Sequence, residues 1–387
     1  MVFLGFNKSS KLFLISLFTH AISAMCLTSC LPSYLVKSGY NQMQILNARE
    51  PIKDVLKRND LPPEQRRKLE FALEVREFAE KNLKLNATEN YKTYVDLKRP
   101  YVSWIASAAK KDELTTHTYW YPIVGNLPYK GFFTKEEAEA EAANLASDGY
   151  DTMVRGVTAY STLGWFDDPL LSSMLDYEDH GIANVIIHES THATLYIKSQ
   201  AEFNERLATF VGNIGTEIFY RNREGANSPT LKQIADENAD ENEFSKFISE
   251  KNKNLKEWYL SQKKPIEEPA RQGQFELIQK QFTDNVAPRL KTKSYLRFSK
   301  AKLNNAILLY YQTYDYDLSD FAKLYSYFKQ DFIEFIKYCR TLEKSSDPNQ
   351  ELKNFLLNHQ PAPQTATNPM PTILKSTTAP SHADPPQ

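Results

Sequence analysis

The segment IIHESTHATLY, residues 186 to 196, places two histidines four positions apart, with a glutamate directly after the first. On an α-helix, His188 and His192 project from one face, so both imidazoles can reach the same metal ion, and Glu189 is rotated beside them. Neutral imidazole is a good zinc ligand, and a catalytic zinc site combines three protein ligands with a water molecule. The spacing therefore predicts one zinc ion per chain and requires one further protein ligand.

The third ligand is expected in the amphipathic segment AEFNERLATFVGNIG, residues 201 to 215. Small residues share one helical face with Glu205, which would let this helix lie close against the first. Glu205 comes 13 positions after His192, enough for a short turn and an antiparallel return. Glu202 is the alternative, but its place at the helix start suits a capping or dipole role better. Glu205 is therefore the predicted third ligand.

This combination of residues suits hydrolysis. Bound zinc lowers the pKa of its water to about 7, and a carboxylate within reach can take the remaining proton and pass it to a leaving amine. Glu189 is placed for that role, so the expected reaction is hydrolysis of peptide bonds by metal-bound water activated by Glu189. A donor must also stabilise the tetrahedral intermediate. The chain has 22 tyrosines, and the sequence does not single out one of them, Tyr121 and Tyr160 included.

The first thirty residues have the architecture of a secretory signal peptide. Two lysines precede an apolar run over residues 12 to 27, which is short for a membrane span. The tetrapeptide Leu27-Thr28-Ser29-Cys30 then resembles a bacterial lipobox. We expect cleavage before Cys30 and its lipidation, which would anchor the protein to a membrane without spanning it. An ordinary signal peptide or an uncleaved anchor is the alternative.

The residues around the cysteines refine this expectation. Leu31 stands where an inner-membrane retention signal would usually carry aspartate, which favours the outer membrane of a bacterial envelope, facing the periplasm. Cys26 would leave with the signal peptide and Cys30 would carry lipid, so Cys339 has no partner for an intrachain disulfide. Its helical context, with no paired histidine to activate it, indicates a packed or partly exposed thiol and not a nucleophile.

Composition and patterning predict the fold class. The chain has 387 residues, of which 41% are hydrophobic, and its 47 basic and 48 acidic side chains include no basic run that could track a phosphate backbone. This argues against nucleic acid as a partner. Helices are predicted over residues 41–100, strands around one helix over 101–163, and helices again from about 179, with long stretches near 201–222, 269–285 and 315–343 and a solvated helical pair over 229–260.

The predicted fold is α+β and predominantly helical, with a small central sheet and an active-site helix. We expect a signal peptide over residues 1–29, one catalytic domain over 30–358, and a disordered proline- and threonine-rich tail over 359–387.

Four segments carry a family resemblance: WYPIVGNLPYKGFF, GYDTMVRGVTAYSTLGWFDDPLLSSML, IIHESTHATLY and FNERLATF. In this order they resemble the predicted aminopeptidase family of bacterial lipoproteins, a group of zinc peptidases with HExxH and NExxA signatures, over most of residues 30 to 355. The resemblance implies a gluzincin-like metallopeptidase with a zincin-like domain. It also implies His188, His192 and Glu205 as ligands and Glu189 as base.

Residues 156 to 170, GVTAYSTLGWFDDPL, allow two interpretations. The first part could be an edge strand that pairs with an extended peptide, which would make Tyr160 a candidate substrate-binding residue. Alternatively, Trp165 and Phe166 pack in the core while Asp167 or Asp168 caps a helix containing Pro169.

The kind of cleavage stays open at the level of sequence. An aminopeptidase needs a carboxylate that receives the free amine of its substrate. The GxMEN segment that better-known gluzincin aminopeptidases use is absent, and the gap between the metal motif and Glu205 is shorter than theirs. Asp167 and Asp168 are candidate substitutes, and an endopeptidase or a processing enzyme is the alternative. So is a zinc-binding scaffold or peptide-binding envelope lipoprotein that hydrolyses nothing.

Overall fold

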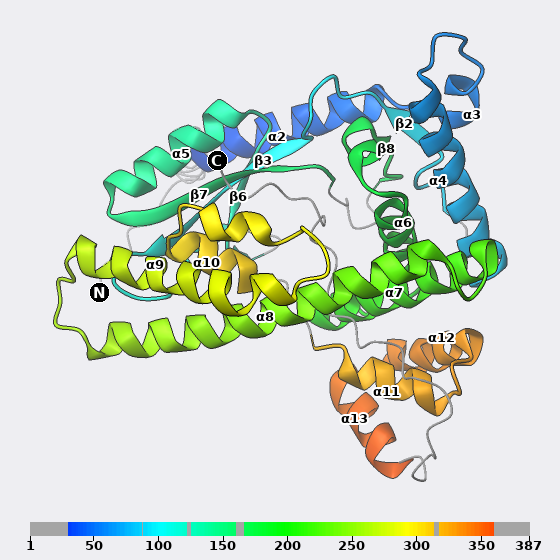
Figure 1. The fold of residues 1–387 in the computed structure, drawn as a ribbon. Coiled ribbons are helices and arrows are strands. Elements are labelled where there is room, and N and C mark those ends of the chain that lie inside the picture. Colours follow the sequence, from blue (N-terminus) through cyan, green and yellow to red (C-terminus); the bar gives the residue numbers. More distant parts are fainter. Residues whose placement is uncertain (1–29, 87, 122–124, 160–165, 313–316, 360–387) are drawn as a thin grey trace, which may run out of the picture. The chain divides into compact units, whose positions relative to one another are not determined.

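The computed structural model describes residues 30–86, 88–121, 125–159, 166–312 and 317–359. The chain divides into two compact units, Met1–Arg49 and Glu50–Gln387. Helix α2 (Cys30–Asn47) belongs to the first unit, and the elements described below belong to the second (Figure 1). No described helix has both the length and the apolar character that crossing a membrane requires.

Three short strands that precede the metal-motif segment in the chain form one small sheet. Its order is β1-β2-β8, with β1 antiparallel and β8 parallel to β2. The bounds are β1 (Glu50–Pro51), β2 (Thr93–Val95) and β8 (Leu170–Leu171). Since β8 leads through the 3₁₀ helix η1 (Ser172–Asp176) into α6 (Asp179–Thr194), this sheet fixes where the metal-motif helix begins.

A second sheet has the order β6-β3-β7, and all its pairings are antiparallel. Its strands are β3 (Ser103–Lys110), β6 (Lys130–Phe132) and β7 (Tyr150–Val157), while β4 (Tyr119–Tyr121) and β5 (Gly125–Leu127) form a separate ribbon. Helices α5 (Lys135–Ser147) and α10 (Asn305–Gln312) both pack on β3 and β7. Because β7 is last in the order β6-β3-β7, it is an edge strand of this sheet among the described strands.

Local sequence explains the helix before β7. Thr134 caps α5 by accepting a hydrogen bond from the Glu137 N–H, and the Thr134 hydroxyl also donates to the Glu137 carboxylate. Gly149 lies between α5 and β7 and adopts the left-handed region, with φ +88°, which glycine adopts without strain. The helix and the flanking strands predicted for this region are confirmed over its described residues.

Two helices pack against α6, the helix that carries the metal motif. Helix α6 packs most extensively on α7 (Ala201–Glu224) and also on α4 (Pro63–Lys81). Contacts between α6 and α7 run from His192 beside Glu205 to Asn184 beside Asn213, so the two helices run in opposite directions. Figure 1 shows α6 and α7 as neighbours, with α4 beside α6.

The remaining helices correct two predictions. The expected helical pair over 229–260 is one helix, α8 (Pro229–Ser261), because after its first position this segment contains neither glycine nor proline to break it. The stretch over 315–343 contains two helices, α11 (Ser319–Tyr327) and α12 (Phe332–Thr341), because Lys329 and Gln330 between them adopt positive φ angles. The other bounds are α3 (Ile52–Val55), α9 (Glu268–Asn285), η2 (Ala287–Arg289), η3 (Leu296–Lys300), η4 (Leu342–Lys344) and α13 (Pro348–Asn358).

The helical prediction over residues 41–100 is wrong in part. Strands β1 and β2 lie in this interval, because each gains a pairing partner: β1 pairs with β2, and β2 pairs with β8 some 75 residues later. The fold class is confirmed as α+β and predominantly helical with small sheets. Cys339 is fully buried, and burial raises the pKa of its thiol, as expected for a packed side chain.

Candidate metal centre

Helix α6 is fixed at both ends. At its start, Asp179 accepts hydrogen bonds from Arg67 at 2.6 and 2.9 Å and forms an ion pair with Lys68 at 3.0 Å, all from α4. At its end, Asn86 donates from its backbone N–H to Thr194 Oγ1 and from its side chain to the Ala193 carbonyl. An apolar face is buried between these anchors, formed by Ile182, Ala183, Ile186 and Ile187. The rigid packing of α6 holds the two histidines in place.

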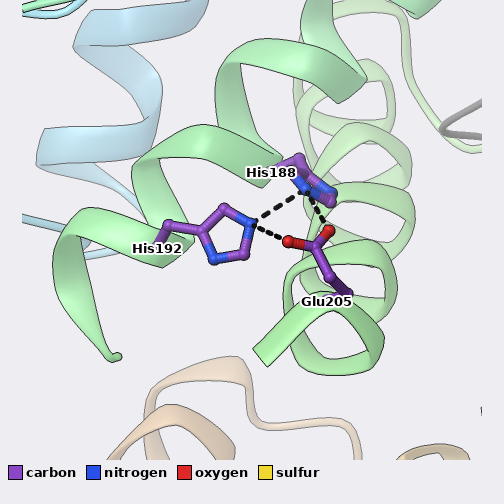
Figure 2. Close-up of side chains that lie close together, drawn as sticks. All are labelled: His188, His192 and Glu205. Atoms are coloured by element: carbon purple, nitrogen blue, oxygen red, sulfur yellow. Dashed lines mark hydrogen bonds and ion pairs between the residues drawn. The ribbon is translucent and has the colours of Figure 1, made fainter. Parts of the chain in front are cut away.

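Three side chains converge at the end of α6 (Figure 2). The Nε2 atoms of His188 and His192 lie 3.1 Å apart. The Glu205 carboxylate on α7 places Oε2 3.5 Å from His188 Nε2 and Oε1 3.4 Å from His192 Nε2. Among the described residues, these three form the group whose ligand atoms could hold one metal ion, with all of them within 4.8 Å of one another. The structure thus brings together the three predicted ligands.

These separations fit a small tetrahedral ion. With metal–nitrogen and metal–oxygen bonds of about 2.0–2.2 Å, two ligands of a tetrahedral zinc ion lie roughly 3.3–3.5 Å apart. The three observed separations, 3.1 to 3.5 Å, are close to this value. The donor set of two imidazoles and one carboxylate also leaves one tetrahedral position open, as in catalytic sites.

The charges of the group favour a cation. Burial alone would raise the pKa of Glu205, but hydrogen bonds from His188 and His192 outweigh it and hold that pKa well below its usual range. Burial lowers the pKa of His192, yet the hydrogen bond to Glu205, together with the charges of Glu205 and Glu189, raises it overall. An anionic carboxylate facing two imidazole nitrogens is the arrangement that a metal cation stabilises.

Glycines on α7 permit its close approach to α6. A Cβ added to Gly212 would lie 3.3 Å from the carbonyl oxygen of Asn184 and 3.3 Å from His188 Cβ. A Cβ added to Gly215 would lie 2.7 Å from Ile187 Cγ2 and 3.0 Å from Leu83 Cδ1. The small residues seen in the sequence around Glu205 therefore have the packing role predicted for them.

A family model described as "Putative aminopeptidase" matches residues 33–355, which is most of the chain. The chain belongs to this aminopeptidase family. Comparisons with curated proteins and with solved structures gave no match. This match confirms the predicted family resemblance. The family description indicates a peptidase, which implies a peptide substrate.

The predicted base of this aminopeptidase-family chain has a neighbour that sequence reasoning missed. Glu189 is partly buried on α6, and the Tyr91 side chain is almost fully buried, with 5% exposed. Burial raises the pKa of the Tyr91 phenol well above its usual range, and the negative charges of Glu189 and Asp168 raise it further. The phenol is therefore protonated at neutral pH. Nothing in the surrounding NYKTYV marks this residue in the sequence.

Backbone contacts hold Tyr91 in position within the aminopeptidase-family domain. Its N–H donates to the Asp168 carbonyl at 2.7 Å, and the Asp168 N–H donates to Asn90 Oδ1 at 2.9 Å. Tyr91 also has a φ of 57°, a conformation that non-glycine residues adopt rarely and only where their surroundings enforce it. The segment before β2 and the segment before β8 are thereby joined next to α6.

The candidate substrate residues of this family member have different surroundings. Tyr160 lies outside the described residues, as does Trp165. Asp167 is exposed and Asp168 is buried, while Tyr121 is buried at the end of β4. Two parts of the alternative interpretation are wrong: Phe166 is 43% exposed and not packed in the core, and Pro169 precedes strand β8 and not a helix. Glu202 lies exposed in the first turn of α7, outside the ligand group.

Proposed function

We propose that this chain is a zinc-dependent peptidase in which His188, His192 and Glu205 hold the ion and Glu189 acts as general base. The observation that carries the proposal is the convergence of the three ligand atoms at separations of 3.1 to 3.5 Å. Zinc is favoured over other metals because two imidazoles and one carboxylate are the ligands it takes in hydrolytic sites. Membership in an aminopeptidase family supports hydrolysis over a purely structural metal.

Each residue of the site would have a separate role in hydrolysis. When bound, zinc would supply a Lewis acid that polarises the scissile carbonyl and lowers the pKa of a water molecule. Glu189 follows His188 directly on α6, so its carboxylate can accept a proton beside the ion and return it to the leaving amine. The negative charge of Glu189 acts on Tyr91, whose buried phenol has a raised pKa, and we propose that this phenol helps to orient the Glu189 carboxylate. Glu205 balances the positive charge of the ion.

The edge strand β7 offers a surface for an extended peptide. The carbonyl of Thr152 accepts a hydrogen bond from Asn304 and that of Thr158 accepts one from Ser173, both on the side away from β3. Because backbone groups alternate along a strand, Val154 and Gly156 direct theirs to the same side. A substrate strand could therefore pair with β7 through these two residues. We assign to Asp167, which is exposed, the role of receiving a substrate amine if cleavage occurs at the N-terminus.

We also propose that Cys30 is lipidated and that the protein is held at the outer membrane, facing the periplasm. The lipobox-like residues 27 to 30, after an apolar run and two lysines, support this location. The substrates would then be peptides or proteins of the envelope.

The test compares wild-type protein with Glu189→Gln, using residues 31–387 purified without lipid. Bound zinc is measured by elemental analysis, and both proteins are incubated with a peptide mixture read by mass spectrometry. One zinc per chain in both, with cleavage in wild type alone, is the expected result. Zinc in both with every peptide intact would overturn the proposal in favour of a metal-stabilised scaffold.

The same mixture settles the position of cleavage if half of its peptides carry an acetylated N-terminus. An aminopeptidase shortens only the peptides with a free amine, one residue at a time. Cleavage within acetylated peptides would identify an endopeptidase and remove the need for an amine-binding carboxylate such as Asp167.

A further inference from the structure

Helix α2 carries an apolar stripe that is open to solvent. Val36 is 74% exposed, Tyr40 64% and Met43 48%. These positions follow i, i+4 and i+7 spacing, so the three side chains lie on one face of the helix. Gly39, beside the stripe, has no atom within 4 Å of an added Cβ.

The charge of this helix is unusual for an exposed one. Its sequence, CLPSYLVKSGYNQMQILN, contains no acidic residue, and Lys37 is its one charged side chain. An exposed helix in water normally carries several charges of both signs. An exposed stripe of Val, Tyr and Met beside polar positions that include a lysine and no carboxylate instead suits a helix that lies in a membrane interface.

The position of the stripe relative to Cys30 indicates its partner. Since α2 begins at Cys30 and an α-helix rises about 1.5 Å per residue, Val36 lies about 9 Å and Met43 about 20 Å along the axis from that cysteine. Acyl chains on Cys30 would be inserted in the bilayer. Val36, at the start of the stripe, would then lie within about 9 Å of the lipid-bearing residue along the helix axis.

We propose that α2 lies along the membrane surface, with Val36, Tyr40 and Met43 inserted between the lipid headgroups. This inference rests on the proposed lipidation of Cys30 and is independent of the peptidase activity. Tyrosine suits this depth because its ring is apolar and its hydroxyl can reach the headgroups. Lys37 can contact anionic phosphates, and no carboxylate is present to repel them.

The experiment uses full-length lipidated protein in vesicles of phosphatidylcholine and phosphatidylglycerol. An environment-sensitive fluorophore is attached to Tyr40→Cys, on the stripe, or to the matched control Ser38→Cys, which lies roughly opposite on the helix. The one cysteine of the mature chain besides Cys30 is Cys339, which is buried, so labelling can be selective. Quenching by lipids that carry a quencher on the acyl chain then reports insertion.

We expect several-fold stronger quenching at position 40 than at position 38. Equal quenching at both positions in protein whose acylation is confirmed by mass spectrometry would overturn the membrane contact while leaving the anchor intact. Protection of position 40 from water without lipid quenching, together with dimers in detergent, would assign the stripe to a second copy of the chain. Absence of acylation would overturn both the anchor and the contact that depends on it, without bearing on hydrolysis.

Discussion

Gly212 on α7 lies directly against His188 on α6, such that a methyl group on Gly212 would lie 3.3 Å from the histidine Cβ. The same methyl would lie 3.3 Å from the Asn184 carbonyl oxygen, a backbone atom that moves only with its helix. Glu205 is two turns earlier on α7. The spacing of the two helices at Gly212 therefore also determines how far the Glu205 carboxylate lies from the histidines.

Gly212→Ala is expected to weaken zinc binding about tenfold with little loss of stability. Extra atoms in a packed interface push its elements apart at a cost of about 1–3 kcal/mol, but alanine favours a helix over glycine by about 1 kcal/mol. The two effects largely cancel in stability, whereas the displacement of the ligands remains. Competition with a chromogenic chelator measures the affinity for zinc, and urea unfolding measures the stability.

Gly215→Ala and Gly273→Ala form a matched pair for the packing argument. At Gly215 the new Cβ would lie 2.7 Å from Ile187 Cγ2, so we expect a loss of about 1–2 kcal/mol. At Gly273 on α9 there is no atom within 4 Å, so we expect a gain of about 0.5–1 kcal/mol. Equal gains in the two variants would show that α7 does not approach Ile187 of α6 as closely as 2.7 Å from an added Cβ.

Glu205→Gln should lose zinc-dependent stabilisation. The amide preserves size but removes the charge that balances the ion. A ligand that binds only the folded state stabilises it by RT ln(1 + [L]/Kd), about 4 kcal/mol at a thousandfold excess over Kd. Zinc should therefore raise the melting temperature of wild type, and a chelator should reverse the effect, while Glu205→Gln responds to neither. Glu202→Gln, an exposed change one turn earlier on the same helix, should behave as wild type.

Tyr91→Phe should reduce turnover about tenfold and leave zinc content unchanged. The substitution keeps the buried ring and removes the hydroxyl whose pKa is raised by the charge of Glu189 and which we propose orients that carboxylate. A positioned proton-transfer group contributes roughly 10²–10⁴-fold to the rate, so a less well oriented base loses part of that factor. Steady-state kinetics should show the loss in kcat with KM little changed. A rise in KM alone would assign Tyr91 to substrate binding.

The three candidate metal ligands were predictable because helical periodicity determines their geometry. Four-residue spacing places His188 and His192 on one face, and the small residues of the NERLATFVG segment mark the face that approaches α6. These signals are local, or involve two helices adjacent in sequence. Tyr91 gives no such signal, because its place beside Glu189 depends on hydrogen bonds to residue 168, far away in sequence. The pairing of β2 with β8 was missed for the same reason.

Glu217 on α7 should make the stability of the protein fall as pH rises. Burial raises the pKa of its carboxyl from 4.5 to about 7, and the charge of Arg221 offsets only part of this effect. The folded pKa is thus above the unfolded one, so folding favours the protonated form. Its contribution to stability is fully present below about pH 4.5 and is lost as pH rises through 7.

Glu217→Gln isolates this contribution, because the amide imitates the protonated carboxyl at every pH. Between pH 5 and pH 8 the free energy of unfolding of wild type should fall relative to that of the variant by on the order of 2 kcal/mol. Urea unfolding at the two pH values measures this difference, from which the titrations common to both proteins cancel. Glu276→Gln, at an exposed position on α9, should show no such difference. If Glu217→Gln instead lost stability equally at both pH values, the Glu217 carboxylate would be ionised in the folded protein and held by a partner that the amide cannot replace.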